Sequence, residues 1–284
     1  MIAPFLRLAK RATLATHDGG LSITIPSIGR LIVPGIPADH APIEIETRPL
    51  LHALGPRGQI GAVSALDVGP KRRAVRIGGD GWSMTLAGSD LRAAHHHALD
   101  PVPPPHVTLD ATTLRRAVAS LAPLASTYSP KLAGIELRQN GATIELAATN
   151  GKQLRRTVIP MVDGRLPDHI CRAIPATTLR ALCEMARGDI RLSWTEQRAD
   201  LSAADWSANI YTIGVPYPVW RDIRPPVHAT SIEIDAATLR AALRRCGKFV
   251  RLSASAAGLT LADPDAGLTL SARRATTASA SAGE

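Results

Sequence analysis

A short alternating strand followed directly by an amphipathic helix is indicated by Val107-Thr-Leu-Asp-Ala-Thr-Thr-Leu114-Arg-Arg-Ala-Val118. Asp110 stands where a helix N-cap is expected, and its carboxylate would accept a hydrogen bond from a free backbone N–H. Leu114 and Val118 then lie one helical turn apart on a face that we expect to be buried.

The same pattern recurs three more times along the chain. The other copies are Ile43-Glu-Ile-Glu-Thr-Arg-Pro-Leu50-Leu-His-Ala-Leu54, Ala173-Ile-Pro-Ala-Thr-Thr-Leu179-Arg-Ala-Leu182 and Ile232-Glu-Ile-Asp-Ala-Ala-Thr-Leu239-Arg-Ala-Ala-Leu243. Their first helical leucines fall at positions 50, 114, 179 and 239, so they are 64, 65 and 60 residues apart. A period this regular indicates an internal repeat.

After each helix the apolar period changes from that of a helix to that of a strand, as in Gly134-Ile-Glu-Leu-Arg and Asp189-Ile-Arg-Leu-Ser. Each repeat unit is therefore predicted to be a strand, a helix and about three antiparallel strands joined by tight turns. One such unit buries only one face, so we expect two units to pair around a common aliphatic core. Residues 1–38 contain strand-like runs but no convincing helix, which predicts an incomplete unit there.

Proline and low-complexity segments suggest the boundaries of the domains. Pro-rich residues 100–105 and the Arg224-Pro-Pro run interrupt the repeats, and the last residues are rich in Ala, Ser and Thr. We predict a partial first domain at 1–100, a middle domain of two units at 106–226, a truncated third domain at 230–272 and a disordered tail at 273–284.

Composition excludes several classes of protein. The chain has 284 residues, of which 45% are hydrophobic and only 3% aromatic. Its longest uncharged stretch, residues 206–220, is about 15 residues long and too short to span a bilayer. The N-terminus meets Arg7 and Lys10 early, unlike a secretory signal. The three cysteines lack metal-ligand spacing, so we expect a cytoplasmic protein without membrane association, disulfide scaffold, metal site or cofactor.

Basic side chains concentrate on the predicted helices. Lys and Arg outnumber Asp and Glu by 33 to 24, for a formal charge of +9. The candidates for contact with a DNA backbone are Arg115, Arg116, Arg180, Arg187, Arg240, Arg244, Arg245 and Lys248. Arg240, Arg244 and Lys248 would share one helical face, and Glu184 alone opposes the series. Few aromatics accompany these arginines, which favours sequence-independent contact with duplex DNA over base stacking; a solvated basic face is the alternative.

Three segments resemble the bacterial sliding clamp, the beta subunit of DNA polymerase III. Ala148-Thr-Asn-Gly-Lys-Gln-Leu154 is similar to the clamp's Ala-Thr-Asp-Gly-His-Arg-Leu, with Asn150, Lys152 and Gln153 as departures. Tyr128-Ser-Pro-Lys-Leu-Ala-Gly-Ile135 resembles the segment ahead of it. Tyr217-Pro-Val-Trp-Arg-Asp-Ile223 resembles the clamp's Phe-Pro-Asp-Tyr-Arg-Arg-Val turn.

This resemblance implies an α+β fold of paired strand–helix–strands units, with helices on the inner face and antiparallel sheets outside. It also implies a non-catalytic processivity factor: a homo-oligomeric ring around double-stranded DNA that docks DNA polymerase and clamp-loader-like proteins. Carried over residue by residue, the partner-peptide pocket comprises Leu132, Thr149, Gly151, Lys152, Gln153, Leu154, Pro218 and Ile223. The clamp completes its pocket with a sixth unit, which we do not expect in this chain.

Two other interpretations remain open from the sequence. A monomeric clamp-fold module or decoy would bind partner peptides without encircling DNA. An enzyme would use His95, His96 and His97 with Asp90 or Asp100 for metal-assisted hydrolysis; consecutive histidines diverge on a regular strand or helix, which disfavours that site. Dimer, trimer and monomer are all compatible with the sequence.

Overall fold

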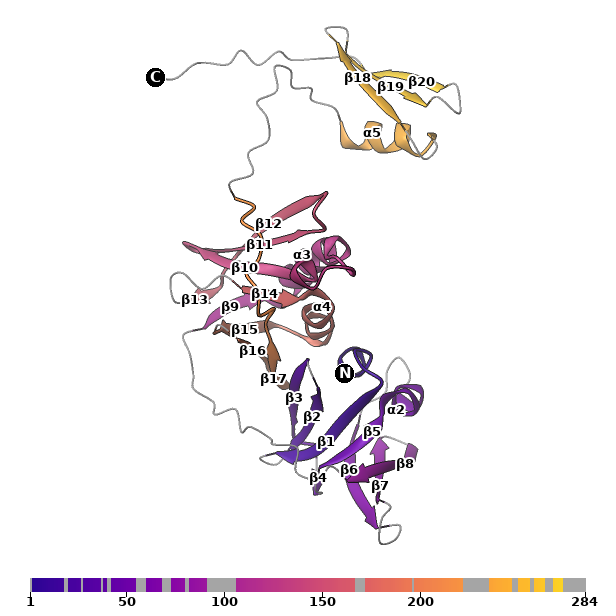
Figure 1. Cartoon of the computed structure of the whole chain (residues 1–284), viewed down its shortest axis with the longest axis vertical. Helices are drawn as coiled ribbons and strands as arrows, with labels where there is room; N and C mark the ends of the chain where they lie inside the picture. The colour runs from indigo at the N-terminus through magenta and orange to yellow at the C-terminus, as the bar shows by residue number, and fades with distance from the viewer. Residues whose placement is uncertain are drawn as a thin grey trace. The chain divides into compact units, whose positions relative to one another are not determined.

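The computed structural model describes two compact parts of the chain, Met1–Pro218 and Val219–Glu284 (Figure 1). The described residues are 2–17, 20–26, 28–36, 38–39, 42–54, 60–67, 73–79, 82–90, 106–166, 172–195, 197–221, 235–246, 250–255, 258–263 and 268–272. Each part is described by itself below.

The centre of the first part consists of two interlocked repeat units. Their elements are β9 (Val107–Asp110), α3 (Ala111–Leu121), β10 (Gly134–Asn140), β11 (Thr143–Thr149), β12 (Leu154–Pro160), β14 (Arg172–Pro175), α4 (Ala176–Met185), β15 (Asp189–Trp194), β16 (Arg198–Ala203) and β17 (Trp206–Tyr211). The first strand of each unit pairs antiparallel with the first strand after the helix of the other: β9 with β15, and β14 with β10. This reciprocal exchange makes a pseudo-two-fold domain and confirms the predicted pairing of units.

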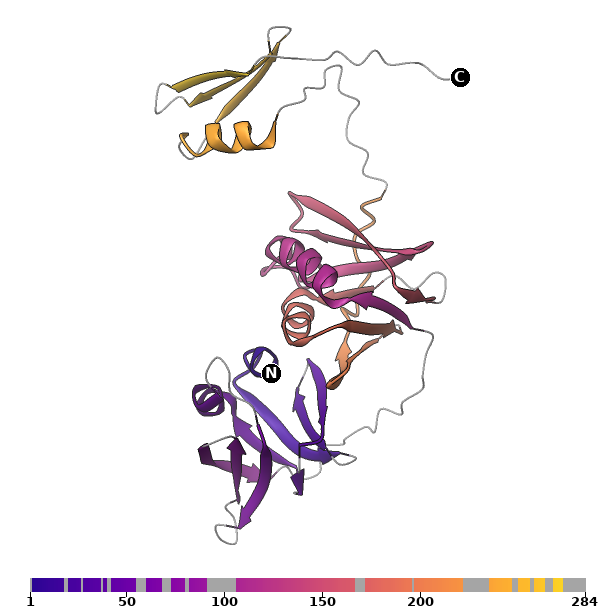
Figure 2. The same cartoon turned by 180° about the vertical axis from the view of Figure 1, so that it is seen from behind.

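Local sequence explains where the two helices begin and which face they bury. Asp110 caps α3, because its Oδ1 accepts a hydrogen bond of 2.7 Å from the Thr113 backbone N–H. Leu114 and Val118 of α3, and Leu179 of α4, are fully buried in the core. The apolar residues of each helix therefore lie on one face, which packs into the core. α3 and α4 lie side by side over the sheets (Figure 2).

The N-terminal region of the first part is built from the same kind of unit. Its elements are α1 (Ala3–Leu6), β1 (Arg11–His17), β2 (Gly20–Ile25), β3 (Gly29–Pro34), β4 (Ala38–Asp39), β5 (Ile43–Glu46), α2 (Thr47–Leu54), β6 (Ala62–Asp67), β7 (Arg73–Gly79) and β8 (Trp82–Asp90). β3 pairs with β17, so one continuous sheet runs through both regions. The two-residue strand β13 (Asp163–Gly164) pairs with β9 and forms one edge of that sheet.

The expectation that residues 1–38 lack a helix is wrong. Ala3–Leu6 forms the single-turn helix α1, in which Phe5 and Leu6 are fully buried. A helix this short does not form on propensity alone, so burial of these two side chains stabilises it. The first unit is thus shortened rather than devoid of its helix.

The second part holds one repeat unit with α5 (Ala236–Leu243), β18 (Arg251–Ser255), β19 (Gly258–Asp263) and β20 (Leu268–Ala272). Asp235 caps α5, since its Oδ2 accepts 2.7 Å from the Thr238 N–H. The three strands form a separate antiparallel sheet. None of the helices among the described residues is long and apolar enough to cross a membrane.

Candidate nucleic-acid interface and partner-docking site

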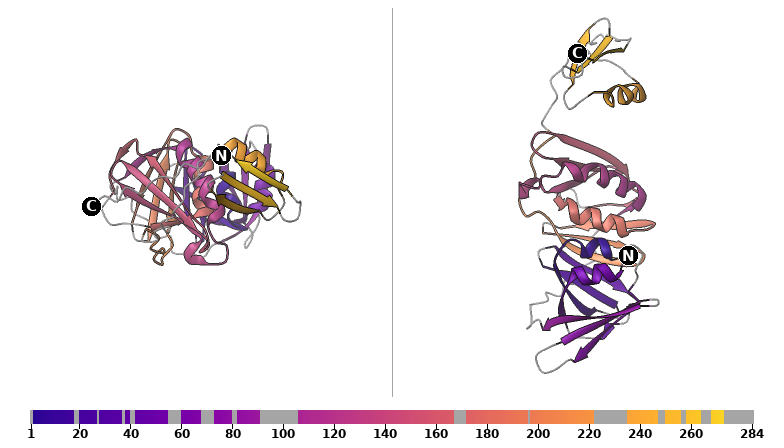
Figure 3. Two further views of the ribbon diagram at one scale, coloured as in Figure 1. Left: turned by 90° about the horizontal axis from the view of Figure 1, so that it is seen from above. Right: turned by 90° about the vertical axis from the view of Figure 1, so that its right-hand side faces the viewer.

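The helices of the first part form a row along one side of its sheets. α3 contacts α4, α4 contacts α1, and α1 contacts α2, and the right-hand view of Figure 3 shows these helices on one side of the strands. Glu184 is the one acidic residue within the described helices. The arginines of these helices, Arg48, Arg115, Arg116 and Arg180, outnumber this acidic residue, so the row carries a net positive charge that suits a phosphate backbone.

On α3 the two adjacent arginines have different surroundings. Arg116 is exposed, so its guanidinium is available to a partner. Arg115 is half-buried and donates hydrogen bonds of 2.9 Å to the Cys183 carbonyl and 2.5 Å to the Ala186 carbonyl. These carbonyls belong to the C-terminus of α4, where a cation is favoured. The prediction that Arg115 faces DNA is therefore replaced by a role in joining the two helices.

On α4 the basic side chains are exposed. Arg180 Nε lies 3.0 Å from Glu184 Oε1, an ion pair one helical turn apart on the surface. Arg187 follows the C-cap of α4 and is exposed. Both arginines keep the accessibility that contact with DNA requires.

Arg240 and Arg244 lie one helical turn apart, because the Arg244 backbone N–H donates to the Arg240 carbonyl at 3.1 Å. α5 ends at Leu243, so Arg244 is its C-cap and Arg245 lies beyond the helix. Arg240, Arg244 and Arg245 are each exposed. Lys248 lies outside the described residues.

Sequence reasoning missed basic residues near the N-terminus. Arg7 is the C-cap of α1, Arg48 lies in the first turn of α2, and both are exposed. Lys10, just before β1, is exposed as well. The absence of acidic residues between positions 1 and 17 is the signal in the sequence that could have found Arg7 and Lys10.

The segment similar to the clamp's Ala-Thr-Asp-Gly forms a tight turn between β11 and β12. Asn150 Oδ1 accepts hydrogen bonds from the backbone N–H groups of Lys152 and Gln153, at 2.9 and 2.8 Å. Thr149 Oγ1 accepts one from the Gly151 N–H at 3.0 Å. Gly151 has a φ of +86°, a conformation that glycine adopts without strain. Asn150 thus supplies the acceptor that an aspartate would supply in the turn.

Tyr217 connects this turn to the rest of the domain. The Thr149 backbone N–H donates to its phenol oxygen at 3.1 Å, and the phenol donates to the Gly134 carbonyl at 3.4 Å. Burial raises the pKa of Tyr217 to about 12, so the phenol remains a donor at neutral pH. Tyr217 belongs to the segment that resembles the clamp's Phe-Pro turn, but it is not one of the predicted pocket residues.

Leu132 is brought to the same turn by the short helix η2 (Pro130–Leu132). A Cβ built on Gly151 would lie 3.7 Å from Leu132 Cδ1, which places the two residues in contact. The preceding loop holds Tyr128, whose side chain is 98% exposed.

The structure places the other predicted pocket residues as follows. Leu154 pairs with Thr149 across the turn and is 40% exposed. Lys152 and Gln153 are exposed in the turn itself, and Pro218 is exposed beside Tyr217. Ile223 lies outside the described residues. The structure therefore groups Leu132, Thr149, Gly151 and Leu154 around one turn.

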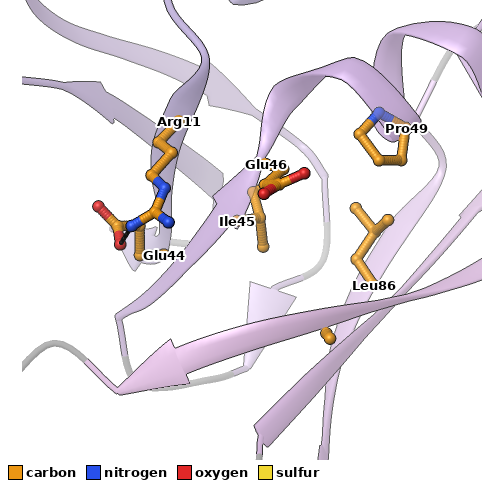
Figure 4. A pocket seen from close by; sticks show the side chains of 7 residues that line it. Arg11, Glu44, Ile45, Glu46, Pro49 and Leu86 are labelled. Carbon is orange, nitrogen blue, oxygen red and sulfur yellow. Dashed lines mark hydrogen bonds and ion pairs between the residues drawn. The ribbon is translucent and has the colours of Figure 1, made fainter.

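A hollow that the sequence did not predict lies where β5 and β8 diverge (Figure 4). These strands pair only at Ile43–Asp90 and Glu44–Ser89. Leu86, Pro49 and Arg11 line the hollow past the last of these pairs. Arg11 Nη1 lies 3.1 Å from Glu44 Oε2, an ion pair at its edge. The hollow therefore arises from the separation of the two strands and is not assigned to ligand binding.

Most residues of the enzyme interpretation are not described by the structure, although Asp90 ends β8. His95, His96, His97 and Asp100 lie outside the described residues, and within them no group of three potential metal ligands occurs. Burial raises the pKa of the Cys183 thiol to about 12, so this cysteine is protonated at neutral pH and unsuited to nucleophilic attack.

The arrangement of paired units with a helix row and outer antiparallel sheets defines the sliding-clamp fold. Solved structures agree. The structure matches the Helicobacter pylori beta clamp bound to a DNA ligase peptide with a TM-score of 0.68 and 15% identity, over 97% of this chain and 82% of that one. For the DNA polymerase III beta subunit of Thermotoga maritima the TM-score is 0.69, with 14% identity over 95% and 76% of the two chains.

The beta subunit from Pseudomonas aeruginosa gives a TM-score of 0.68 with 17% identity, over 94% of this chain and 76% of that one. No protein-family model and no curated protein sequence matches the chain. The likeness to the clamp family is therefore confirmed at the level of the fold, including helices on one face and antiparallel sheets on the other.

Proposed function

We propose that this chain is a divergent member of the sliding-clamp family, a non-catalytic replication factor that encircles duplex DNA as a homo-oligomeric ring. The observation that carries the proposal is the clamp fold combined with a helix row that holds a single acidic residue. In this role the chain works in the cytoplasm. The predicted domains at 1–100, 106–226 and 230–272 then correspond to successive clamp domains.

The exposed arginines support contact with the DNA backbone. Arg116, Arg180 and Arg187 lie on or beside neighbouring helices of the first part. In the second part, Arg240, Arg244 and Arg245 are exposed on or just after α5. Each phosphate neutralised by such a side chain contributes about 0.9 to the slope of log affinity against log salt for duplex DNA. No base-reading element accompanies them in the described residues, so binding is expected to be independent of sequence.

Salt dependence tests this assignment directly. Replacing Arg116 and Arg187 together by alanine is expected to reduce the slope by up to about 2, measured by fluorescence anisotropy on a duplex oligonucleotide. Arg138→Ala is the matched control, because Arg138 is exposed on strand β10 rather than on a helix. An unchanged slope in the double variant would refute the DNA-facing role of the helix row.

We also propose that polymerase and clamp-loader-like partners dock a short peptide at the turn around Leu132, Thr149, Gly151 and Leu154. The Helicobacter pylori relative is described in complex with a DNA ligase peptide, which shows the kind of ligand that the fold accepts. Leu132 and Leu154 supply apolar contacts for such a peptide.

The docking proposal is tested with a fluorescent peptide that represents the partner's clamp-binding segment. Leu132→Ala is expected to weaken binding about tenfold, whereas Val162→Ala, at an exposed apolar position outside the turn, is expected to leave it unchanged. Equal affinity of both variants would contradict docking at this turn.

A further inference from the structure

A second hollow, which we call the outer hollow, lies over strands β15, β16 and β17 of the first part (Figure 1). Its volume is about 270 Å³, and it shares no lining residue with the docking turn. Its lining is mostly polar and includes Arg191, Ser193, Asp200, Ser202, Ser207 and Asn209. This composition differs from that of the apolar docking site and raises the question of which ligand the hollow suits.

The alternation of side chains along the strands places the outer hollow on the face of the sheet turned away from the helices. Leu192 of β15 lies in the core, so its neighbours Arg191 and Ser193 point to the opposite face. In β17, Ala208 lies in the core and Ser207 on the outer face. Because the apolar residues of α3 and α4 belong to that same core, the outer hollow is separate from the helix row.

The register of the strands brings one cation and two hydroxyls into a single row. Arg191 is directly opposite Ser202, and Ser202 is directly opposite Ser207. Because neighbouring strands lie about 4.8 Å apart, a group bound above Ser202 is within reach of the residues on both sides of it. The row therefore offers the donors of a guanidinium and of two hydroxyls to the same group.

These donors are not used by other described residues. Arg191 is exposed, and it makes no ion pair or side-chain hydrogen bond within the described part of the chain. The hydroxyls of Ser202 and Ser207 likewise make no hydrogen bond to a described residue. By contrast, Arg198 on the same sheet is already engaged, since its Nε lies 3.0 Å from Asp200 Oδ1. Arg191 is thus the guanidinium that is left for a ligand.

The charge of Asp200, the carboxylate in the lining, is already compensated. Its Oδ1 accepts a hydrogen bond of 2.5 Å from Asn209 Nδ2, in addition to the ion pair with Arg198. Arg191 is therefore the uncompensated charge of the outer hollow. A positive, hydroxyl-rich surface favours an anion with several acceptor oxygens over a cation or an apolar ligand.

We propose that the outer hollow binds the phosphate group of a small phosphorylated molecule. The guanidinium of Arg191 matches two phosphate oxygens in its fork geometry, and Ser202 and Ser207 donate to the others. Ser193 and Asn209 lie in the adjoining row, where they contact the rest of the ligand. The volume of about 270 Å³ is near the lower end of the roughly 300–1,000 Å³ of small-molecule sites, so it suits a compact phosphoester.

Nuclear magnetic resonance of the full chain, without DNA, tests the proposal. Inorganic phosphate and glycerol phosphate are titrated separately, and the amide signals of Ser202 and Ser207 are followed in TROSY spectra of the deuterated protein. Both phosphates are expected to shift these signals in a saturable manner. Acetate is expected to bind more weakly, because it offers fewer oxygens and less charge. No saturable shift with phosphate, or equal affinity for acetate, would overturn the proposal.

Substitutions in the row identify the groups that hold the anion. Arg191→Gln is expected to weaken phosphate binding at these signals about tenfold or more, because it removes charge-assisted hydrogen bonds. Ser202→Ala combined with Ser207→Ala is expected to weaken it about fivefold. Arg138→Gln is the matched control, since Arg138 is exposed on β10 outside the outer hollow. Unchanged affinity in Arg191→Gln, or an equal loss in Arg138→Gln, would overturn the assignment.

DNA binding separates this site from the helix row. Arg191→Gln is expected to leave the salt slope for duplex DNA unchanged, because Arg191 lies on the face of the sheet opposite the helices. Arg116→Ala combined with Arg187→Ala is expected to retain phosphate binding in the outer hollow. A lower salt slope in Arg191→Gln would assign this arginine to DNA and overturn the proposal. Failure of encirclement would leave the phosphate titration unaffected.

Discussion

Arg115→Ala separates the structural arginine of α3 from its DNA-facing neighbour. The substitution removes two hydrogen bonds from a charged donor to the Cys183 and Ala186 carbonyls, at 2.9 and 2.5 Å. A hydrogen bond to a charged group contributes roughly 1.5–3 kcal/mol when it is shielded from water. Arg115 is only half-buried, so we expect a loss of about 2–3 kcal/mol from both bonds together.

Differential scanning calorimetry measures this loss in the first part of the chain. For a domain of this size each kcal/mol lowers Tm by about 2–4 °C, so Arg115→Ala is expected to lower Tm by roughly 4–12 °C. Arg116→Ala is the matched control, because its exposed side chain leaves stability within about 0.5 kcal/mol of the wild type.

In DNA binding we expect the opposite order: Arg116→Ala has the larger effect and Arg115→Ala has none. Arg116→Ala should lower the salt slope by about 0.9, whereas Arg115→Ala should leave it unchanged at a temperature where the variant is folded. An unaltered Tm for Arg115→Ala, combined with a lower salt slope, would refute the assignment of Arg115 to the contact between helices.

Three further predictions concern local contacts. Asn150→Ala should destabilise the turn by about 1 kcal/mol in urea unfolding, whereas Asn150→Asp should retain stability because a carboxylate accepts the same two N–H bonds. Tyr217→Phe should make stability less sensitive to alkaline pH: the raised pKa stabilises the fold below pH 10, and this contribution is lost as pH rises toward about 12. Hydrogen bonds from Thr113 lower the pKa of Asp110, so its contribution is lost as pH falls through the acidic range, and Asp110→Asn should reduce that loss in thermal scans at pH 6 and pH 3. An Asn150→Asp variant as unstable as Asn150→Ala, or alkaline and acid profiles unchanged in the other two variants, would contradict these assignments.

The repeat was predictable because its information is local. Buried residues such as Leu114 and Val118 recur at helical spacing, and Asp110 is a cap that acts three residues away. Each of these features depends on neighbours in the sequence. The same logic failed for α1, whose single turn exists because Phe5 and Leu6 are buried by residues distant in the chain.

The candidate sites were only partly predictable because several of their contacts join distant segments. Arg115 meets Cys183 across 68 residues, and Tyr217 meets Thr149 across the same separation. No periodicity encodes such a contact, so the sequence alone predicts Arg115 as a DNA contact and does not reveal Tyr217 as part of the docking site. The resemblance to the clamp did place Leu132, Thr149 and Gly151 together, because a shared fold carries long-range contacts that composition lacks.

Retention on DNA of defined topology distinguishes encirclement of the duplex from ordinary binding. The chain is loaded on nicked circular DNA, separated from free protein by gel filtration, and followed before and after the circle is cut once. Encirclement predicts that the protein stays with the circle in moderate salt and leaves once free ends are present. Equal retention on circular and linear DNA, or a chain that binds partner peptides but is never retained on the circle, would contradict the proposal that it is a sliding clamp.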